Sequence, residues 1–356
     1  MVHEDSSMTQ RCRSAAGVLL VAGLCSLAPG AGAAQSAKPG AKPAAATPPR
    51  SPARQAWTAA RTPWGDPDLQ GIWLNATITP LERPAGLADK PFLTEEEAAA
   101  LERQTLAQRA ASERAQRAGE VGSYNNFWFD SGTKVVSSRQ TSLVIEPADG
   151  RVPVRPEAEK IREENLARSG DSYEYMSVWD RCVTRGMPGA MFPAGYNNAY
   201  QILQTPDYVA IVHEMIHEVR IIPLDRRPHL PPRIALWMGD SRGRWEGTTL
   251  VVETTNFGGK GWIATSAASG RIKGIPQSPT LRVVERFTPA DAGTIQYEVL
   301  VEDPAMYFRP WKVAMPLGRD ESYRIFEYAC HEGNHAIVNM LNGAKAATDF
   351  FRGEKP

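Results

Sequence analysis

Residues 208–225 read YVAIVHEMIHEVRIIPLD, and the way this stretch folds decides the class of the protein. At its centre, HEMIH fits His-Glu-x-x-His, a pattern in which two histidines one helical turn apart bind zinc and the glutamate is the general base. The flanking valines and isoleucines disfavour a helix and favour a strand. Pro223 would also end a helix soon after the motif. We therefore predict a β-hairpin with the motif at its turn, and not a zinc-protease helix.

Other segments of the chain have the same strand character. They are β-branched, partly alternating and bounded by Gly, Pro, Asp or Ser, and they include TSLVIEP (141–147), TLVVETTNF (249–257), LRVVERFT (281–288) and TIQYEVLVED (294–303). Because no long helices separate most of them, we expect antiparallel pairing. The predicted class is α+β and predominantly antiparallel β, as a curved sheet or a lipocalin-like barrel or sandwich.

A few peripheral helices are predicted, at 94–117, 156–168 and 335–347. In the first, Thr94 and Glu97 form a capping box, in which each side chain bonds the backbone of the other residue. In the second, Pro156 suits the first turn and Gly170 lies just past the end. These signals place the helices at the edges of the β-rich region.

A second His-Glu-x-x-His stretch, HEGNH, occupies residues 331–335. Gly333 falls where a zinc-binding helix would be continuous. The stretch also follows YRIFEYAC (323–330), which we predict as a strand. The chain is therefore expected to turn from strand to helix here, with Asn334 or a neighbour as the helix cap.

Side chains of the two stretches are predicted to converge on one pocket. Histidines and carboxylates together bind a metal, or transfer protons without one. The candidates are Glu214, Glu332, Glu327, His213, His217 and His331. The alternative is that these groups hydrogen-bond within a polar core or rim. His213, His217 and His331 are the candidate metal ligands, so the expected cofactor is either none or one divalent metal ion.

Aromatic and amide residues gather in FPAGYNNAYQ (192–201). Tyr196, Asn197 and Asn198 are predicted to bind a ligand in a turn, because aromatic rings and amide donors suit an aromatic or polycyclic compound. The asparagines are equally suited to brace the loop through bonds to the backbone. Trp179 and the other tryptophans are more simply core residues.

The stretch GDSRG (239–243) fits Gly-x-Ser-x-Gly, the nucleophile motif of α/β-hydrolases. That motif needs a helix after it, whereas strand-like residues follow here. We therefore predict a hairpin turn at Asp240–Gly243, with Ser241 as a turn residue.

The chain has 356 residues, with 40 basic and 40 acidic side chains. A net charge of zero gives no reason to expect nucleic acid or an anionic membrane as partner. Arg11 and Arg13 precede the apolar run Ala15–Ala28, and small residues follow it, which predicts a cleaved signal peptide. The predicted organisation is a signal peptide at 1–34, a disordered Ala/Pro-rich linker at 35–60 and a single β-rich domain at 61–353. We expect a periplasmic or secreted protein with no stable membrane insertion.

Removal of the signal peptide leaves Cys182 and Cys330 of the four cysteines. An oxidising compartment favours a disulfide between them. The alternative is two separate buried thiols.

Several phrases of the chain are shared with known sequences, namely DLQGIW (68–73), YNNFWFDSGT (124–133), EMIHEVRIIPLD (214–225), GDSRGRWEGTTLVVETTNF (239–257) and YACHEGN (328–334). On these phrases the chain resembles a large family of exported bacterial hypothetical proteins of no established activity. The resemblance implies export and one intact domain. It also points to Glu214, His217 and Arg220, to Arg244–Gly247 and to Glu327–Asn334. In that family CHEGN is commonly followed by Tyr, where this chain has His335, which argues against a zinc role for His335. Gly71–Trp73 also resembles the Gly-x-Trp opening of lipocalin-like barrels.

The leading functional hypothesis is an exported enzyme that acts on a small, largely apolar or aromatic metabolite by acid–base chemistry, with or without a metal. Hydrolysis, elimination and isomerisation all fit. The predicted catalytic residues are Glu214, His217, Arg220, His331 and Glu332. The carboxylates are the candidate bases, the histidines are acids or metal ligands, and Arg220 or Arg244 neutralises developing negative charge. The alternatives are a non-catalytic periplasmic binding protein of lipocalin type and an envelope structural protein. An enzyme would gather these groups in one cleft, whereas a binder would show an apolar cavity.

Overall fold

The HEMIH stretch forms a β-hairpin, as predicted. Strand β4 (Tyr208–His213) pairs antiparallel with β5 (Val219–Pro223), and a single 3-10 turn, η5 (Met215–His217), connects them. Ile216 in this turn has a φ of 63°, so the segment is not one continuous helix. Alternate residues of the two strands are buried: Val209, Ile211, His213, Arg220 and Ile222. The branched residues therefore act as strand residues with one face inward.

The computed structural model describes residues 57–115, 130–264, 270 and 272–352. In this part of the chain ten strands form one antiparallel sheet in the order β5-β4-β3-β1-β10-β9-β8-β7-β6, with β2 beside β10. The other strands are β1 (Gly71–Leu74), β2 (Val144–Glu146), β3 (Ala199–Gln204), β6 (Asp240–Glu246), β7 (Thr249–Thr255), β8 (Arg282–Asp291), β9 (Thr294–Glu302) and β10 (Trp311–Arg319). The predicted signal peptide and most of the predicted linker lie outside these residues.

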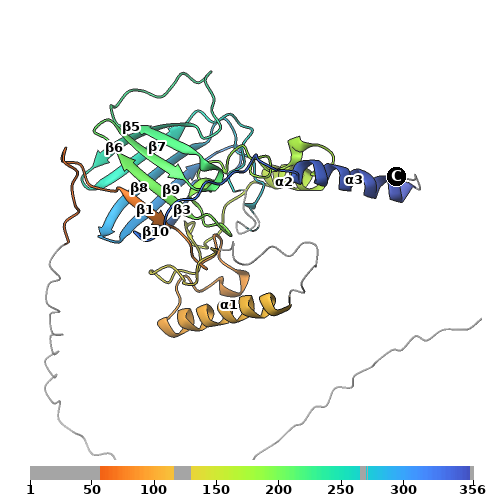
Figure 1. Cartoon of the computed structure of the whole chain (residues 1–356), viewed down its shortest axis with the longest axis horizontal. Coiled ribbons are helices and arrows are strands. Elements are labelled where there is room, and N and C mark those ends of the chain that lie inside the picture. Colours follow the sequence, from red (N-terminus) through yellow and green to blue (C-terminus); the bar gives the residue numbers. More distant parts are fainter. Residues whose placement is uncertain (1–56, 116–129, 265–269, 271, 353–356) are drawn as a thin grey trace, which may run out of the picture. The chain divides into compact units, whose positions relative to one another are not determined.

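The sheet curves until its two end strands, β5 and β6, lie next to each other (Figure 1). Across this junction Arg220 Nε donates to Ser241 Oγ at 2.9 Å. Gly243 makes the close approach possible, because a Cβ atom there would lie 2.7 Å from Leu224 Cδ2 and 2.8 Å from Ile222 Cγ2. The result is a nearly closed, antiparallel barrel, which confirms the predicted β-rich class.

Large side chains fill the inside of this barrel. The fully buried residues of β8, β9 and β10 include Phe287, Ile295, Tyr297, Val299, Trp311 and Leu317. Burying one such side chain stabilises the fold by about 1.5–3 kcal/mol. The barrel interior is therefore a packed core that holds the strands in register.

Three α-helices accompany the sheet in the described ranges: α1 (Glu95–Ala115), α2 (Pro156–Ala167) and α3 (Ala336–Arg352). All three were predicted, and residues 116 and 117 of the first prediction lie outside the description. The capping box forms, since the Glu97 N–H donates to Thr94 Oγ1 at 3.2 Å and the Thr94 N–H donates to Glu97 Oε2 at 2.9 Å. None of the helices in the described part is long and apolar enough to cross a membrane.

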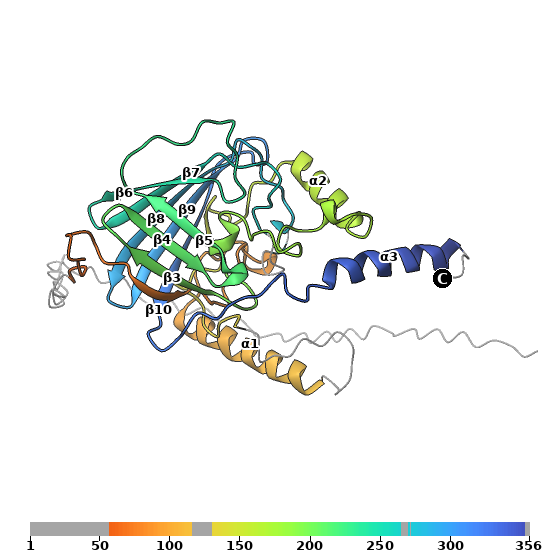
Figure 2. The same ribbon diagram turned by 45° about the horizontal axis from the view of Figure 1, so that its top comes forward.

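Helix α3 extends away from the sheet (Figures 1 and 2), and the chain just after α2 comes close to it. A Cβ atom on Gly170, just after α2, would lie 2.6 Å from the Cβ of Ala344 on α3. Gly170 therefore permits this contact as well as following the helix end.

Two local predictions were wrong. The segment Asp240–Gly243 is part of strand β6, and the turn falls at Gly247, which has a φ of 63°. Ser241 lies in the sheet as a buried residue, and the hydrogen bond that it accepts from Arg220 favours this position over a turn. The segment 323–330 forms no strand, although all of it is described. It forms a connection without regular secondary structure, held by Glu214 and by the disulfide of Cys330.

Candidate functional site

The buried carboxylate of Glu214, in the first motif, binds the segment that leads to the second motif. Its Oε1 accepts a hydrogen bond from the Tyr323 hydroxyl at 2.8 Å and another from the Phe326 backbone N–H at 3.0 Å. Both donors belong to residues 320–335, which we call the strap. The β4–β5 turn and the first part of the strap therefore lie together. Neither donor belongs to HEGNH, so the convergence of the two motifs on one pocket stays a prediction.

A disulfide fixes the far end of the strap. Cys182 is bonded to Cys330, with their Cα atoms 5.6 Å apart, which confirms the predicted pair. Asn334 then caps α3, because its Oδ1 accepts from the Ala336 N–H at 3.1 Å. The strap is thus held by Glu214 at one point and by the disulfide at another.

A cavity of about 430 Å³ lies beside the disulfide. Its aromatic walls are Trp179, Tyr196 and Tyr328. The rings of Tyr196 and Tyr328 are stacked, with centroids 6.2 Å apart and planes at 22°, and the Trp179 and Tyr196 centroids are 6.1 Å apart. The strap also contributes Glu332 and Asn334 to the lining. The predicted ligand residue Tyr196 therefore faces a concave, aromatic surface of ligand size.

A buried arginine lies behind these aromatic walls. Arg185 is only 3 % exposed, and its guanidinium carbon is 5.8 Å from the centroid of the Trp179 ring. Within the described residues it donates no hydrogen bond and pairs with no carboxylate, and its Nε is buried without a partner. Burial lowers the pKa of Arg185, while the hydroxyls of Tyr200, Tyr196 and Tyr328 act in the opposite direction. Among the described residues, no carboxylate neutralises the positive charge of Arg185.

His213 lies deep in the same region. Its ring meets Tyr200 edge-on, with centroids 5.3 Å apart. The pKa of His213 is lowered to about 3, mainly by burial and also by the charges of Arg220 and Arg185. His213 is therefore neutral near pH 7, and burial keeps it out of contact with solvent.

The loop before β3 is braced by its own side chains. Asn198 Nδ2 donates to the carbonyls of Asp130 at 2.6 Å and Ala194 at 3.0 Å, and its Oδ1 accepts from the Ala194 N–H at 2.7 Å. Asn197 has a φ of 52°, which suits a turn. The alternative role of Asn198, bracing the loop, is the one the contacts support.

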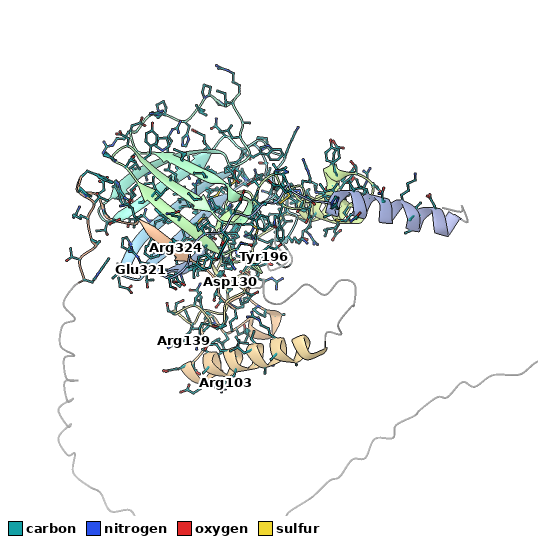
Figure 3. All side chains as sticks on the ribbon, in the orientation of Figure 1. Arg103, Asp130, Arg139, Tyr196, Glu321 and Arg324 are labelled. Atoms are coloured by element: carbon teal, nitrogen blue, oxygen red, sulfur yellow. A yellow bond between two sulfur atoms is a disulfide. The ribbon has the colours of Figure 1, made fainter. Side chains whose placement is uncertain are left out.

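Asp130 lies next to Tyr196 (Figure 3), and its N–H donates to the Gly195 carbonyl at 2.7 Å. Loss of solvent raises the pKa of Asp130; a hydrogen bond from Asn198 opposes this rise, and the charge of Glu214 adds to it. Asp130 and Glu214 therefore form a pair of neighbouring carboxyl groups near Tyr323.

The two arginines proposed to neutralise a substrate are engaged elsewhere. Arg220 points into the barrel, where it pairs with Glu285 through both terminal nitrogens and also donates to Ser241 and Thr254. Arg244 pairs with Glu246 at 2.8 Å, and about half of its side chain is exposed. Neither arginine is free to meet a ligand in the cavity.

Most of the remaining predicted site residues lie away from the cavity. His331, Glu332 and Glu327 are exposed, and only Glu332 of these lines the cavity. The described residues contain no group of three or more His, Cys, Asp or Glu side chains arranged to hold a metal. The side chain of His217 is outside the description, so its catalytic and metal roles stay predictions.

Comparisons with family models, with curated proteins and with solved structures found no match to this chain. Its function therefore has to be argued from the site. The sequence patterns do not point to Arg185, Tyr323 or Tyr328 as site residues, and they favour Trp179 as a core residue. One signal was present: Trp179, Arg185 and Tyr328 all lie within three residues of a disulfide cysteine.

Proposed function

We propose that this protein binds a small, largely aromatic molecule in the cavity beside the disulfide. The observation that carries the proposal is the wall of Trp179, Tyr196 and Tyr328 around a space of about 430 Å³. Ligand sites of proteins commonly have about this volume and are lined by aromatic side chains with a few polar groups. Here Asn334 and Glu332 supply polar groups at the edge.

Binding is better supported than acid–base catalysis because of where the ionisable groups lie. Glu214 and His213 are buried, and Arg220 is saturated by Glu285, Ser241 and Thr254. A general base has to reach the proton it removes. Glu214 and Arg220 therefore position the strap and the barrel, and the rings around the cavity hold the ligand.

The lipocalin-type alternative is retained in modified form. A lipocalin holds its ligand within the barrel, whereas large side chains occupy the barrel interior here. The proposed ligand lies instead between the strap and the segment around Cys182. The proposal includes export to the periplasm or beyond, which a disulfide between Cys182 and Cys330 supports.

The test is calorimetric titration of the full-length, disulfide-bonded protein with 2-naphthamide and with 2-naphthoate. At least one of these aromatic probes should bind. Trp179→Ala should weaken the binding about tenfold or more, because the naphthyl ring can no longer stack on the indole ring. Trp57→Ala is the matched control, since Trp57 is 43 % exposed and does not line the cavity. If neither probe binds, or if both variants bind alike, the proposed function is wrong.

A second function, acid–base chemistry at Glu214, has one specific observation in its favour. Glu214 Oε2 is buried and has no hydrogen-bond partner in the part of the chain that the structure describes, and the Tyr323 hydroxyl that binds Oε1 lies next to it. A carboxylate with one free oxygen beside a phenol suits proton transfer. If Glu214→Gln retains its fold and ligand binding but loses turnover of a bound compound, this second function replaces the first.

A further inference from the structure

We infer that the ligand is an aromatic monocarboxylate and that Arg185 is the group that binds its carboxylate. This inference rests on the proposed function and adds the chemical class of the ligand. It starts from a contrast among the buried arginines of the protein.

Arg83 and Arg220 are buried and well supplied with acceptors. Arg83 donates from Nε to Thr141 Oγ1 at 3.0 Å and from Nη1 to the Ala148 carbonyl at 2.9 Å. Arg220 donates to Glu285 and two hydroxyls. Arg185 is less exposed than either, at 3 % against 8 % and 5 %, yet donates no hydrogen bond within the described part of the chain. A buried charge is normally paired and hydrogen-bonded, so Arg185 lacks a partner that its surroundings call for.

The location of Arg185 says where that partner would come from. Its guanidinium lies over Trp179, and Tyr196 and Tyr328 are close enough to affect it electrostatically. These three rings are the walls of the cavity. Arg185 does not itself line the cavity; its guanidinium lies behind the Trp179 ring, where an anion that passes between the rings of the wall would meet it.

The chemistry of a guanidinium selects the anion. Its planar donors match the two oxygens of a carboxylate and hold them in a fork. Phosphate monoesters would fit the same donors, but Asp180 and Glu332 also line the cavity and repel a second negative charge. The Asp180 carboxylate accepts from Ser177 Oγ at 2.7 Å, and Glu332 is exposed and screened by solvent, so one negative charge is tolerated. The aromatic walls then require a ring on the carboxylate.

The test compares 2-naphthoate with 2-naphthamide, which have the same ring and differ in charge. Wild-type protein should bind the carboxylate on the order of tenfold or more tightly, as expected for a hydrogen-bonded charge. Arg185→Met should remove this preference, so that the two probes bind with similar affinity, and Arg185→Lys should keep part of it. As a control for folding, the midpoint of urea denaturation and the presence of the disulfide are measured for each variant.

The outcomes separate the two proposals. If both probes bind equally to wild type and Trp179→Ala weakens both, the inference about Arg185 is overturned and the aromatic cavity stands. If naphthylmethylammonium binds more tightly than naphthoate, the acidic rim selects a cation and the inference is again overturned. If no probe binds, the proposed function itself fails. The comparison in wild-type protein decides these cases even where Arg185→Met does not fold.

Discussion

At the scale of single residues, the barrel interior contains an ion pair whose removal should be costly. Arg220 and Glu285 have side chains 3 % and 0 % exposed and pair through two bonds. Removing one member of such a pair leaves a buried charge and costs about 3–5 kcal/mol. We expect Arg220→Met to lower the free energy of unfolding by about this amount, measured by urea denaturation.

The control for that prediction is the double variant Arg220→Met, Glu285→Leu. Replacing both charges by apolar groups should recover most of the loss, because no unpaired charge remains. A double variant that is as unstable as the single one would show that packing, and not charge, was lost.

Arg185 should behave in the opposite way. Because it has no acceptor among the described residues, Arg185→Met removes a buried charge without exposing a new one. We expect ligand-free Arg185→Met to be as stable as wild type or more stable, in the same urea experiment. A loss as large as that predicted for Arg220→Met would mean that Arg185 has a structural partner within the protein.

These two arginines also show what the sequence could and could not predict about the site. Arg220 lies in an alternating strand, so its inward position follows from the pattern, but its partner Glu285 is 65 residues away. Arg185 lies in RCVTRGMP, which has no periodicity that indicates burial. Glu214 was predicted because of its motif, yet its role depends on Tyr323 and Phe326, which the chain brings to it only through the tertiary fold.

At the scale of elements, the closure of the barrel depends on Gly243. An added Cβ atom would lie within 2.8 Å of the side chains of Leu224 and Ile222 on the neighbouring segment. Overpacking of this kind costs about 1–3 kcal/mol. We expect Gly243→Ala to lower the unfolding free energy within that range. Gly318→Ala is the matched control, because Gly318 also lies in a strand and its Cβ would meet nothing within 4 Å.

The strap is a second element whose attachment can be tested. The Cys182–Cys330 bond closes a loop with a sequence separation of 148. Loss of a native disulfide typically costs about 2–5 kcal/mol. We expect the Cys182→Ser, Cys330→Ser variant to lose stability in this range and to lose binding of the naphthyl probes, since Tyr328 is no longer fixed. Unchanged binding in a destabilised variant would show that the strap does not form the ligand site.

The elements differ in how far the sequence predicts them. The hairpin around HEMIH and the capped helix at Thr94 follow from local rules, because β-branched runs and a capping box act within a few residues. Strand β10 escaped prediction, since Pro316 and Gly318 weaken its strand pattern and pairing with β9 compensates. The strap shows the opposite error. YRIFEYAC has a strand-like sequence but pairs with no strand in the described structure, and Glu214 and the disulfide hold it in place.

At the scale of the whole molecule, His213 links stability to pH. Its pKa is about 3 in the folded protein and near the ordinary 6.5 in the unfolded chain. The unfolded state therefore takes up a proton first as the pH falls. Above pH 6.5, His213 is neutral in both states and has no effect on how stability depends on pH. Below pH 6.5, the free energy of unfolding falls by about 1.4 kcal/mol per pH unit until the pKa of the folded state is reached.

The measurement is urea denaturation of wild type and His213→Phe at intervals between pH 7 and about pH 5, where ordinary carboxyl groups do not yet titrate. The wild type should lose stability with the slope of roughly one proton, and the variant, which keeps a ring beside Tyr200, should show a flatter profile. Asp130 works in the other direction, because its raised pKa favours the folded state at low pH, but both proteins contain Asp130 and its effect cancels in the difference. Parallel profiles would mean that His213 takes up its proton at about the same pH in the folded protein as in the unfolded chain. The ring would then have to be reached by solvent or by an acid, and the acid–base function at the β4–β5 turn would regain support over simple binding.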